Sequence, residues 1–290
     1  MKIIVKIKGG IGNQLFQYAI GKSLSERFNC TLKMDLSSYA DYSYDSKFEL
    51  NKILETIKIC EPEEINEGQG VYFLNERYFN SIEDLKNLPF ECKSIVIDGY
   101  WQHERYFDKK IINDLYQSLD KKYSQITKLY EEKFPKFQNS VAVHVRRRDY
   151  SHMGLCTDEY YIACINEILK QDEFKAIFLF SDEPNSSLNF LNSIYKSSVI
   201  LVKSDDDLAD LYLLSKFKNI VISNSTYSWW AAYFDEVNKD NIIYPDPWIV
   251  IDEQTKPCPI RWRKVSNAVR ERKISLELIE DYKSQLNSIE

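Results

Sequence analysis

Apolar and polar residues follow two different periods along this chain. Short runs rich in Val and Ile predict buried strands, and apolar residues spaced three and four positions apart predict amphipathic helices. The predicted strands are Lys2–Lys8, Thr31–Leu36, Ser94–Ile97, Val141–Val145, Ala176–Phe180, Ser198–Val202, Asn219–Ile222 and Asn241–Tyr244. The predicted helices are Leu15–Phe28, Phe107–Phe134, Asp158–Lys170 and a segment from Asp205 to Phe217.

Strands that alternate with helices at this spacing predict parallel sheets and an α/β fold. The segment between Ser37 and Pro89 has little periodicity, and we expect mostly loop there. Pro135 and Asn139 predict a boundary after the long helix, so we expect two Rossmann-like domains, residues 1–137 and 138–290.

Polar clusters directly follow four of the predicted strands. They are Gly9–Gln14, Arg146–Asp149, Ser181–Glu183 and Ser223–Ser228. In a doubly wound sheet the carboxyl ends of the strands lie along one edge, where ligands bind. We therefore treat these clusters as candidate parts of a site.

The cluster after Val141–Val145 is basic. Arg146, Arg147 and Arg148 cannot be buried without partners, so the strand must deliver them to the rim of the sheet. Arginine suits bidentate recognition of phosphate. A solvated run of charge is the alternative, but the neighbouring His144 and Asp149 favour a site in which the acid orients one arginine.

The glycine-rich turn contains Gly10 and Gly12 and opens a helix. It lacks the Gly-Lys-Ser/Thr of a phosphate-binding P-loop, and Leu15 replaces the third glycine of a dinucleotide fingerprint. Glycines there let backbone N–H groups approach an anion, and a plain tight turn is the alternative. Asn13 and Gln14 can reach a ligand, although Asn13 is as suited to capping the helix.

Aromatic and amide residues follow the strand Ser94–Ile97. Tyr100, Trp101 and Gln102 could hold a sugar by stacking and hydrogen bonding, or they could pack at a domain edge. The sequence leaves both interpretations open.

Composition narrows the class of protein. A net charge of −6 argues against general binding of nucleic acid, so the arginines are better explained as a local anion site. The six cysteines form no Cys-x-x-Cys pair, which disfavours a zinc site or a redox dithiol. No apolar run approaches the roughly 18 residues of a membrane span, and no signal peptide is recognisable, so we expect a cytoplasmic protein. The basic segment Arg261–Lys273 could touch an anionic membrane, but a solvated amphipathic helix explains it better.

Together these residues predict a nucleoside diphosphate site. The arginines and the Ser223–Ser228 turn provide two phosphate-type sites, and Asp182 could accept hydrogen bonds from a guanine base. A nucleoside diphosphate bound between two such domains indicates a glycosyltransferase.

Five stretches carry a resemblance to a known family. They read GGIGNQLFQYA, DGYWQHERYF, VAVHVRRRDY, FSDE and DLYLLSKFKNIVISNSTYSWWAAYF, with a weaker one at PDPWIVIDEQTKPCPIRW. The chain resembles glycosyltransferase family 11, the bacterial α-1,2-fucosyltransferases. The His-x-Arg-Arg-x-Asp motif of GDP-fucose enzymes fits His144, Arg146, Arg147 and Asp149. Arg148 stands where bacterial members usually have glycine, and Glu183 replaces a second aspartate.

The resemblance implies a GT-B-like fold with two parallel sheets facing across a cleft, the acceptor on the first domain and the donor on the second. It implies an inverting transfer of L-fucose from GDP-β-L-fucose, without metal or other cofactor, to a galactoside glycan at O2 of galactose. The acceptor belongs to bacterial surface polysaccharide, such as O-antigen, or oligosaccharide synthesis, and a lipid-linked acceptor would bring the enzyme to the inner face of the membrane. Transfer of another GDP-linked sugar and a catalytically weak glycan-binding or nucleotide-sugar-binding protein are the alternatives.

The resemblance also assigns roles to residues. The catalytic candidates are Arg146, Arg147, Asp149 and Asn13, with Asp149 either a general base or an orienter of arginine. The donor-binding candidates are Gly10, Gly12, Gln14, His144, Ser181, Asp182, Asn224, Ser225, Thr226 and Tyr227. The acceptor-binding candidates are Tyr100, Trp101 and Gln102, and no metal ligand is expected.

Overall fold

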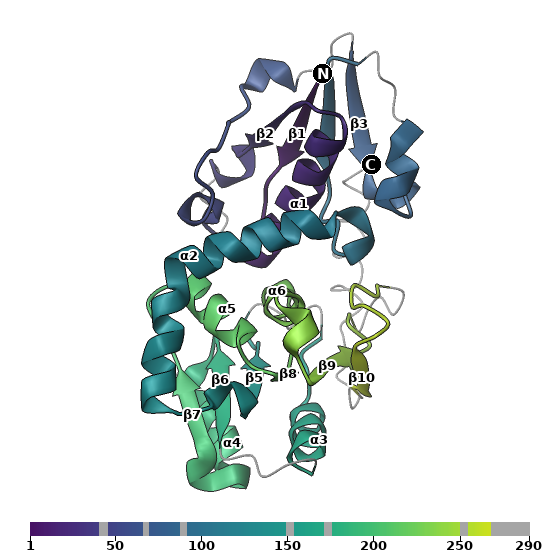
Figure 1. The fold of residues 1–290 in the computed structure, drawn as a ribbon. Coiled ribbons are helices and arrows are strands. Elements are labelled where there is room, and N and C mark those ends of the chain that lie inside the picture. The colour runs from purple at the N-terminus through teal and green to yellow at the C-terminus, as the bar shows by residue number, and fades with distance from the viewer. Residues whose placement is uncertain are drawn as a thin grey trace. The chain divides into compact units, whose positions relative to one another are not determined.

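The chain forms two compact units, Met1–Ile126 and Thr127–Glu290 (Figure 1). The fold is that of a computed structural model, which describes residues 1–40, 46–65, 70–87, 92–148, 154–170, 176–249 and 255–267. Each unit is built on one parallel sheet, so the prediction of an α/β fold is confirmed. We expected the domain boundary after residue 137, whereas the two units divide inside helix α2 (Lys109–Lys133).

Unit 1 (Met1–Ile126) contains a four-stranded sheet in the order β2-β1-β4-β3. Its strands are β1 (Lys2–Lys6), β2 (Thr31–Asp35), β3 (Val71–Asn75) and β4 (Ser94–Asp98), and all neighbours are parallel. Helix α1 (Ile11–Arg27) follows β1 through the glycine turn. Short 3-10 turns connect the elements at Ser37–Tyr39, Leu50–Lys52, Pro62–Glu64, Glu76–Tyr78, Ile82–Asn87 and Glu104–Tyr106.

Unit 2 (Thr127–Glu290) contains a six-stranded parallel sheet in the order β10-β9-β8-β5-β6-β7. The strands are β5 (Val141–Val145), β6 (Ile177–Ser181), β7 (Val199–Val202), β8 (Asn219–Val221), β9 (Asn241–Asp246) and β10 (Arg263–Ser266). The helices are α3 (Asp158–Leu169), α4 (Pro184–Tyr195), α5 (Asp207–Ser215) and α6 (Thr226–Tyr233), with 3-10 turns at Phe137–Asn139, Lys196–Ser198 and Glu236–Asn238. The side chain of Thr157 accepts a hydrogen bond from Tyr160 N at 3.1 Å, which confirms Thr157 as the N-cap of α3.

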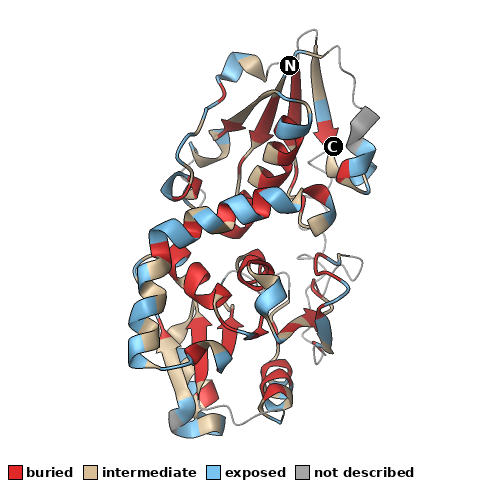
Figure 2. Cartoon of the chain, viewed as in Figure 1, coloured by how far each residue is buried: buried red, intermediate tan, exposed pale blue. Residues whose placement is uncertain are grey.

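Both faces of the second sheet are covered. Strand β5 is buried along its whole length (Figure 2), and its residues alternate between the two faces. One face packs against α3 and α4 in a core that includes Val141, Val143 and Val145. The other face carries an aromatic cluster in which Phe178 lies 5.0 Å from Phe217, measured between ring centroids. This double coverage explains why the strands read as continuous apolar runs.

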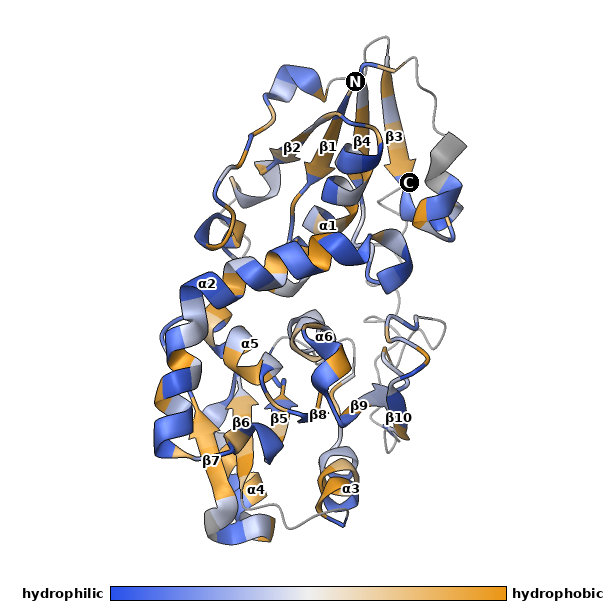
Figure 3. Ribbon diagram, viewed as in Figure 1, coloured by the Kyte–Doolittle hydropathy of each residue, from blue (hydrophilic) through white to orange (hydrophobic). Residues whose placement is uncertain are grey.

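Helix α2 is amphipathic, and apolar and polar bands alternate along it in Figure 3. Its buried residues recur at helical spacing: Ile111, Ile112, Leu115, Leu119 and Tyr123. The sequence therefore predicted this helix almost to its observed ends.

Two strands were not predicted. Strand β3 falls in the segment that we expected to be mostly loop, and β10 falls in the basic segment that we interpreted as a solvated helix. That interpretation is wrong for Arg263–Ser266, which pairs with β9 in parallel register. Strand β10 is an exposed edge strand with two cations, so it has no apolar alternation to reveal it.

Candidate functional site

The arginine turn begins where β5 ends. Val145 pairs in register with Ser181 of β6, so the turn Arg146–Arg148 and Asp182 start from adjacent strand ends. One carboxylate oxygen of Asp182 accepts the backbone N–H of Arg147 at 2.9 Å, and the other accepts that of Arg148 at 3.1 Å. Arg146 Nε lies 3.1 Å from Asp182 Oδ2. A single carboxylate therefore binds the backbone of Arg147 and Arg148 and lies beside the side chain of Arg146.

The side chains of the turn have different surroundings. Arg147 forms an ion pair with Asp158, the first residue of α3, and its guanidinium lies 5.8 Å from the centre of the Phe190 ring. Arg146 keeps 29% of its side chain exposed, and Arg148 is exposed. Asp158 was not among the predicted residues, because an acid at a helix start is ordinary. Arg147 is thus anchored, and Arg146 and Arg148 are the more accessible cations.

Asp182 was predicted to recognise a guanine base. In the structure each of its oxygens accepts a backbone N–H of the arginine turn, which gives Asp182 a role in organising the turn, and its contact with a guanine base stays a prediction. Ser181 has a comparable internal role, since its hydroxyl bonds Ser187 Oγ at 2.9 Å and accepts Glu183 N at 3.1 Å.

His144 is buried beneath the end of β5 and is neutral at ordinary pH. Its Nδ1 lies 2.8 Å from Ser223 Oγ, and its ring stacks on Tyr227 with centroids 5.3 Å apart. Burial, aided by the nearby charge of Arg146, lowers the pKa of His144 to about 3. A neutral ring can stack without repelling the arginines beside it.

The polar turn after β8 leads into α6. Asn224 Nδ2 donates to Gly154 O at 2.8 Å, and the hydroxyl of Tyr227 donates to Asp207 O at 2.7 Å. Ser225 is the N-cap of α6 but its side chain makes no capping bond, and Thr226 opens the helix. The first turn of a helix points N–H groups with no partner inside the helix toward any anion at its end. The helix N-terminus expected after β8 is thus present, and its binding of phosphate stays a prediction.

The glycine turn of unit 1 follows β1. Gly9 has φ +75, and a Cβ there would come within 2.7 Å of Asn13 Nδ2. Gly10 is exposed, and a Cβ there would meet nothing closer than 4.0 Å. Gly12 is buried in the first turn of α1, and no side chain caps that helix. The open backbone at Gly10 keeps the approach of an anion possible.

Gln14 is fully buried and serves the fold of unit 1. Its side-chain nitrogen donates to Gly9 O at 3.0 Å and to Lys47 O at 2.7 Å, and its oxygen accepts Glu49 N at 2.9 Å. We therefore revise the prediction that Gln14 binds a donor. The sequence could not show this, because two of its partners lie more than thirty positions away.

The structure brings Asn13 and the aromatic turn together. Gln102 Nε2 donates to Asn13 Oδ1 at 2.9 Å, so Asn13 contacts a predicted acceptor residue rather than capping α1. Lys8 Nζ lies 5.1 Å from the centre of the Tyr100 ring. Trp101 is fully buried, edge-on against Tyr106 at 5.0 Å, so its ring supports the turn and offers no face to a sugar, contrary to our expectation.

Asp149 lies outside the described residues, so the structure gives no geometry for it. Each unit nevertheless gathers predicted residues at the carboxyl edge of its own sheet. The turn Arg146–Arg148, His144 and the Ser223–Tyr227 segment form the group in unit 2. Gly10, Asn13, Tyr100 and Gln102 form the group in unit 1.

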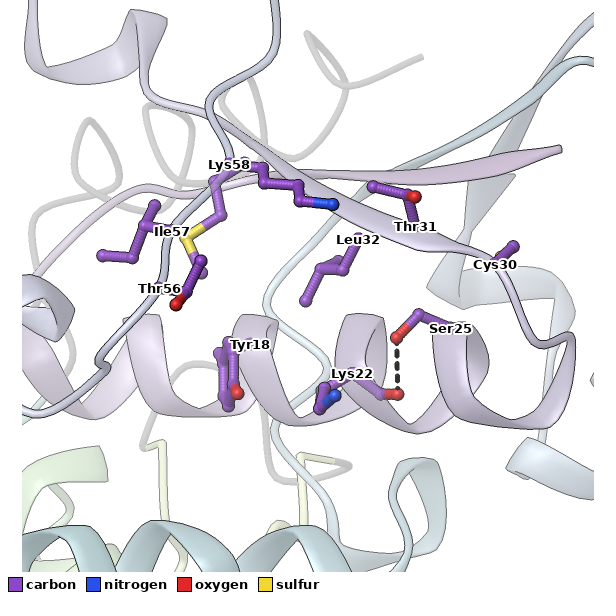
Figure 4. A pocket seen from close by; sticks show the side chains of 10 residues that line it. Tyr18, Lys22, Ser25, Cys30, Thr31, Leu32, Thr56, Ile57 and Lys58 are labelled. Carbon is purple, nitrogen blue, oxygen red and sulfur yellow. Dashed lines mark hydrogen bonds between the residues drawn. The ribbon is translucent and has the colours of Figure 1, made fainter.

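Two hollows lie apart from these groups. One of about 290 Å³ lies between α1 and β2, where Tyr18, Lys22 and Lys58 line it (Figure 4). The other, of about 650 Å³, is lined by residues that precede strands, including Asn139 and Lys218. Neither contains a predicted site residue, and the second lies at the amino edge of its sheet, where ligands of such sheets do not usually bind.

Within the described ranges, no group of three or more His, Cys, Asp or Glu side chains could hold a metal ion. The acids Asp205–Asp207 instead begin α5, where Asp206 Oδ1 accepts Leu208 N at 3.1 Å. No helix in the described part of the chain is both long and apolar enough to cross a membrane.

Comparisons with known proteins agree with this organisation. A model for the family described as glycosyl transferase family 11 matches residues 2–247. An alpha-1,2-colitosyltransferase of Escherichia coli is 29% identical over 294 residues, which cover 91% of this chain and 98% of that protein. The O-antigen biosynthesis glycosyltransferase WbnK of Escherichia coli is 26% identical over 296 residues, which cover 88% of this chain and 98% of that protein.

Solved structures show the same fold. The fucosyltransferase NodZ from Bradyrhizobium superposes with a TM-score of 0.51 at 18% identity, over 80% of this chain and 92% of that one. NodZ soaked with GDP-fucose gives a TM-score of 0.50 at 18% identity, over 82% of this chain and 96% of that one. The chain thus has the GT-B-like fold of these enzymes.

Proposed function

Because the chain belongs to glycosyl transferase family 11, we propose that it transfers L-fucose from GDP-β-L-fucose to a hydroxyl of a glycan acceptor. The expected position is O2 of a galactoside in a bacterial surface polysaccharide or oligosaccharide. The observation that carries the proposal is the arginine turn at the carboxyl end of β5, where Asp182 accepts the backbone N–H groups of Arg147 and Arg148. Fixed cations at a sheet edge suit a diphosphate leaving group.

The proposed reaction is a single displacement. The bond between the anomeric carbon of fucose and the β-phosphate oxygen breaks, and its electron pair leaves with GDP. The acceptor oxygen bonds the opposite face of that carbon, which inverts it, and loses its proton to a base or to solvent. Negative charge grows on the phosphate, so donors that are already in place stabilise the transition state.

Residues of unit 2 are assigned to the donor. Arg146, the more accessible arginine of the motif, faces the diphosphate, with Arg147 oriented by Asp158 and the N-terminus of α6 at Ser225 and Thr226 as a second anion site. The stacked pair of His144 and Tyr227 lies on the guanine side. With these cations, the reaction is expected to need no metal ion.

Residues of unit 1 are assigned to the acceptor and the sugar. Tyr100 and Gln102 contact the acceptor, and Asn13, which Gln102 holds, lies near the fucose or the phosphates. Asp149 is either the general base or an orienter of arginine, and a good leaving group lowers the need for a base.

A second candidate function is transfer of another GDP-linked sugar. The relative that is 29% identical is named for colitose, which favours this candidate. The two candidates share the donor nucleotide and differ in the sugar.

The deciding experiment measures GDP release from GDP-fucose and from other GDP-sugars, with and without a panel of β-galactosides. Release from GDP-fucose that rises with one acceptor supports a fucosyltransferase and identifies the acceptor class. Release from a different GDP-sugar supports the second candidate, and tight GDP binding without any release supports a binding protein.

The same assay tests whether the reaction needs a metal ion. Activity is expected to survive EDTA, because in this proposal arginines and helix N-termini, in place of a metal ion, stabilise the negative charge on the diphosphate. Loss of activity on chelation with recovery on adding Mn²⁺ would refute metal independence.

A further inference from the structure

Glu76 lies beside the aromatic turn although nothing in the sequence connects them. Glu76 directly follows β3, and Asn75, the last residue of β3, pairs in register with Asp98, the last residue of β4. The segment Gly99–Gln102 begins one residue after Asp98. Glu76 and the aromatic turn therefore start from neighbouring strand ends of the same sheet.

The carboxylate of Glu76 is bound to the backbone of that turn. Its Oε2 accepts the N–H of Trp101 at 2.5 Å, and the N–H of Tyr100 donates to the same carboxylate. Burial raises the pKa of Glu76, while these two N–H groups and the charge of Lys8 act to lower it. The carboxylate is thus desolvated but has specific donors, which is typical of a group that holds a structure in place.

The turn has a conformation that needs such support. Trp101 has φ +54, in the left-handed region that a large side chain rarely adopts. Gly99 has φ +150, and a Cβ there would lie 3.0 Å from Glu76 Oε2. Strained backbone of this kind persists only where its surroundings hold it, and Glu76 supplies two of the bonds that do so.

The turn presents its polar groups to the proposed site. Gln102 reaches Asn13, and the ring of Tyr100 lies against Lys8, which itself pairs with Asp98 at 2.9 Å. The buried Gln17 Nε2 donates to Gly99 O at 3.3 Å. The positions of Tyr100 and Gln102 thus depend on backbone that Glu76 fixes.

We propose that Glu76 is a positioning residue for the sugar acceptor, holding Gly99–Gln102 in the shape that presents Tyr100 and Gln102. This inference rests on the proposed function, since it requires an acceptor at this turn. Glu76 acts through the backbone and does not itself exchange a proton with the acceptor.

The test compares Glu76→Ala and Glu76→Gln with wild type in steady-state kinetics, with Glu64→Gln as a matched control. Glu64 is also a part-buried carboxylate of unit 1, but it pairs with Lys2 and Lys33 at the opposite, amino edge of the sheet. Glu76→Ala is expected to raise the acceptor KM about tenfold and to change the donor KM less than about twofold. Glu76→Gln keeps one side-chain oxygen that can accept a hydrogen bond, so its acceptor KM is expected to lie between those of wild type and Glu76→Ala. Glu64→Gln is expected to leave both KM values unchanged.

Three results would overturn the inference. They are equal rises in both KM values, an unchanged acceptor KM, and a large loss of kcat in Glu76→Gln at saturating acceptor, which would indicate a general base. If Glu76→Ala does not fold, Glu76→Gln carries the comparison, together with acceptor affinity by calorimetric titration. A wild-type enzyme that neither transfers sugar nor binds any glycan overturns the proposed function and this inference, whereas wild-type transfer with unaffected variants overturns this inference alone.

Discussion

At the scale of single residues, one part-buried carboxylate organises the arginine turn. Asp182 binds the backbone of Arg147 and Arg148 and pairs with Arg146. A carboxylate that accepts two backbone N–H groups and faces a cation fixes both the shape and the charge of the turn. The positions of the arginines therefore depend on a residue that need not touch the ligand.

Asp182→Asn is expected to weaken GDP binding about tenfold and to lower the melting temperature slightly, because the amide keeps one acceptor oxygen but places an N–H against a backbone donor. Asp182→Ala should lower stability by about 1 kcal/mol, because it leaves the part-buried backbone N–H of Arg147 without its acceptor. Calorimetric titration with GDP and thermal unfolding measure the two effects. Wild-type affinity in Asp182→Asn would show that the turn holds without this carboxylate, and Asp158→Asn, which releases only Arg147, is the comparison with a smaller expected loss.

His144 makes stability depend on pH. Its pKa is lowered from 6.5 to about 3 in the folded protein, so the folded state favours the neutral ring. This contribution to stability is complete above pH 6.5 and is lost as the pH falls toward 3, at up to about 1.4 kcal/mol per pH unit. Denaturant unfolding between pH 7.5 and pH 5 should show the loss in wild type and a flatter dependence in His144→Gln.

His103 provides the control for this experiment, because burial lowers its pKa as well. His103→Gln should keep most of the wild-type dependence, because the shift at His144 is the larger one. Equal slopes in wild type and His144→Gln would mean that other groups dominate acid unfolding.

At the scale of elements, the junction between β1 and α1 combines a glycine of positive φ, Gly9, with one of negative φ, Gly10. Gly9→Ala should lower stability by about 1–2 kcal/mol, because alanine would have to adopt φ +75 and push Asn13 aside. Gly10→Ala should leave stability unchanged, since Gly10 has φ −72 and room for a methyl group. Thermal unfolding separates the two variants.

Steady-state kinetics of Gly10→Ala give a second test, of whether Gly10 belongs to the donor site. If an anion approaches the backbone at Gly10, Gly10→Ala should raise the donor KM without lowering the melting temperature. A donor KM equal to wild type would remove Gly10 from the donor site.

The elements also show what the sequence could and could not predict. Strand β5 and helix α2 were predictable because burial imposes a period on their residues. Strand β10 was not, because an edge strand with exposed cations has no such period. Gln14 and Asp182 were assigned to the ligand because a polar residue in a turn looks the same whether its partner is a substrate or distant backbone.

At the scale of the whole molecule, the proposed donor residues belong mostly to unit 2. GDP should therefore slow amide hydrogen exchange more at Arg146–Arg148 and Ser223–Tyr227 than at Gly9–Asn13 of unit 1. Exchange measured by mass spectrometry with and without saturating GDP tests this. Protection that is greatest in unit 1 would reverse the assignment of donor and acceptor sides.

The sequence predicted two α/β units but set their boundary after the end of α2. The two compact units divide within the continuous helix α2, whereas a sequence points to a boundary in a loop rich in proline or glycine. Its first part buries Leu115 and Leu119 in unit 1, and its last part places Tyr130 against Phe137 and Phe178 of unit 2.

This shared helix constrains how enzymes of this architecture can exchange parts. A recombinant that takes unit 1 from one relative and unit 2 from another must join the parents within a helix, in the same helical phase. A join at Pro135, which looks natural in the sequence, would leave the aromatic residues Tyr130 and Phe134 foreign to the core they pack against. Exchange of unit 1 between relatives therefore requires that the second half of α2 remain with the sheet of unit 2.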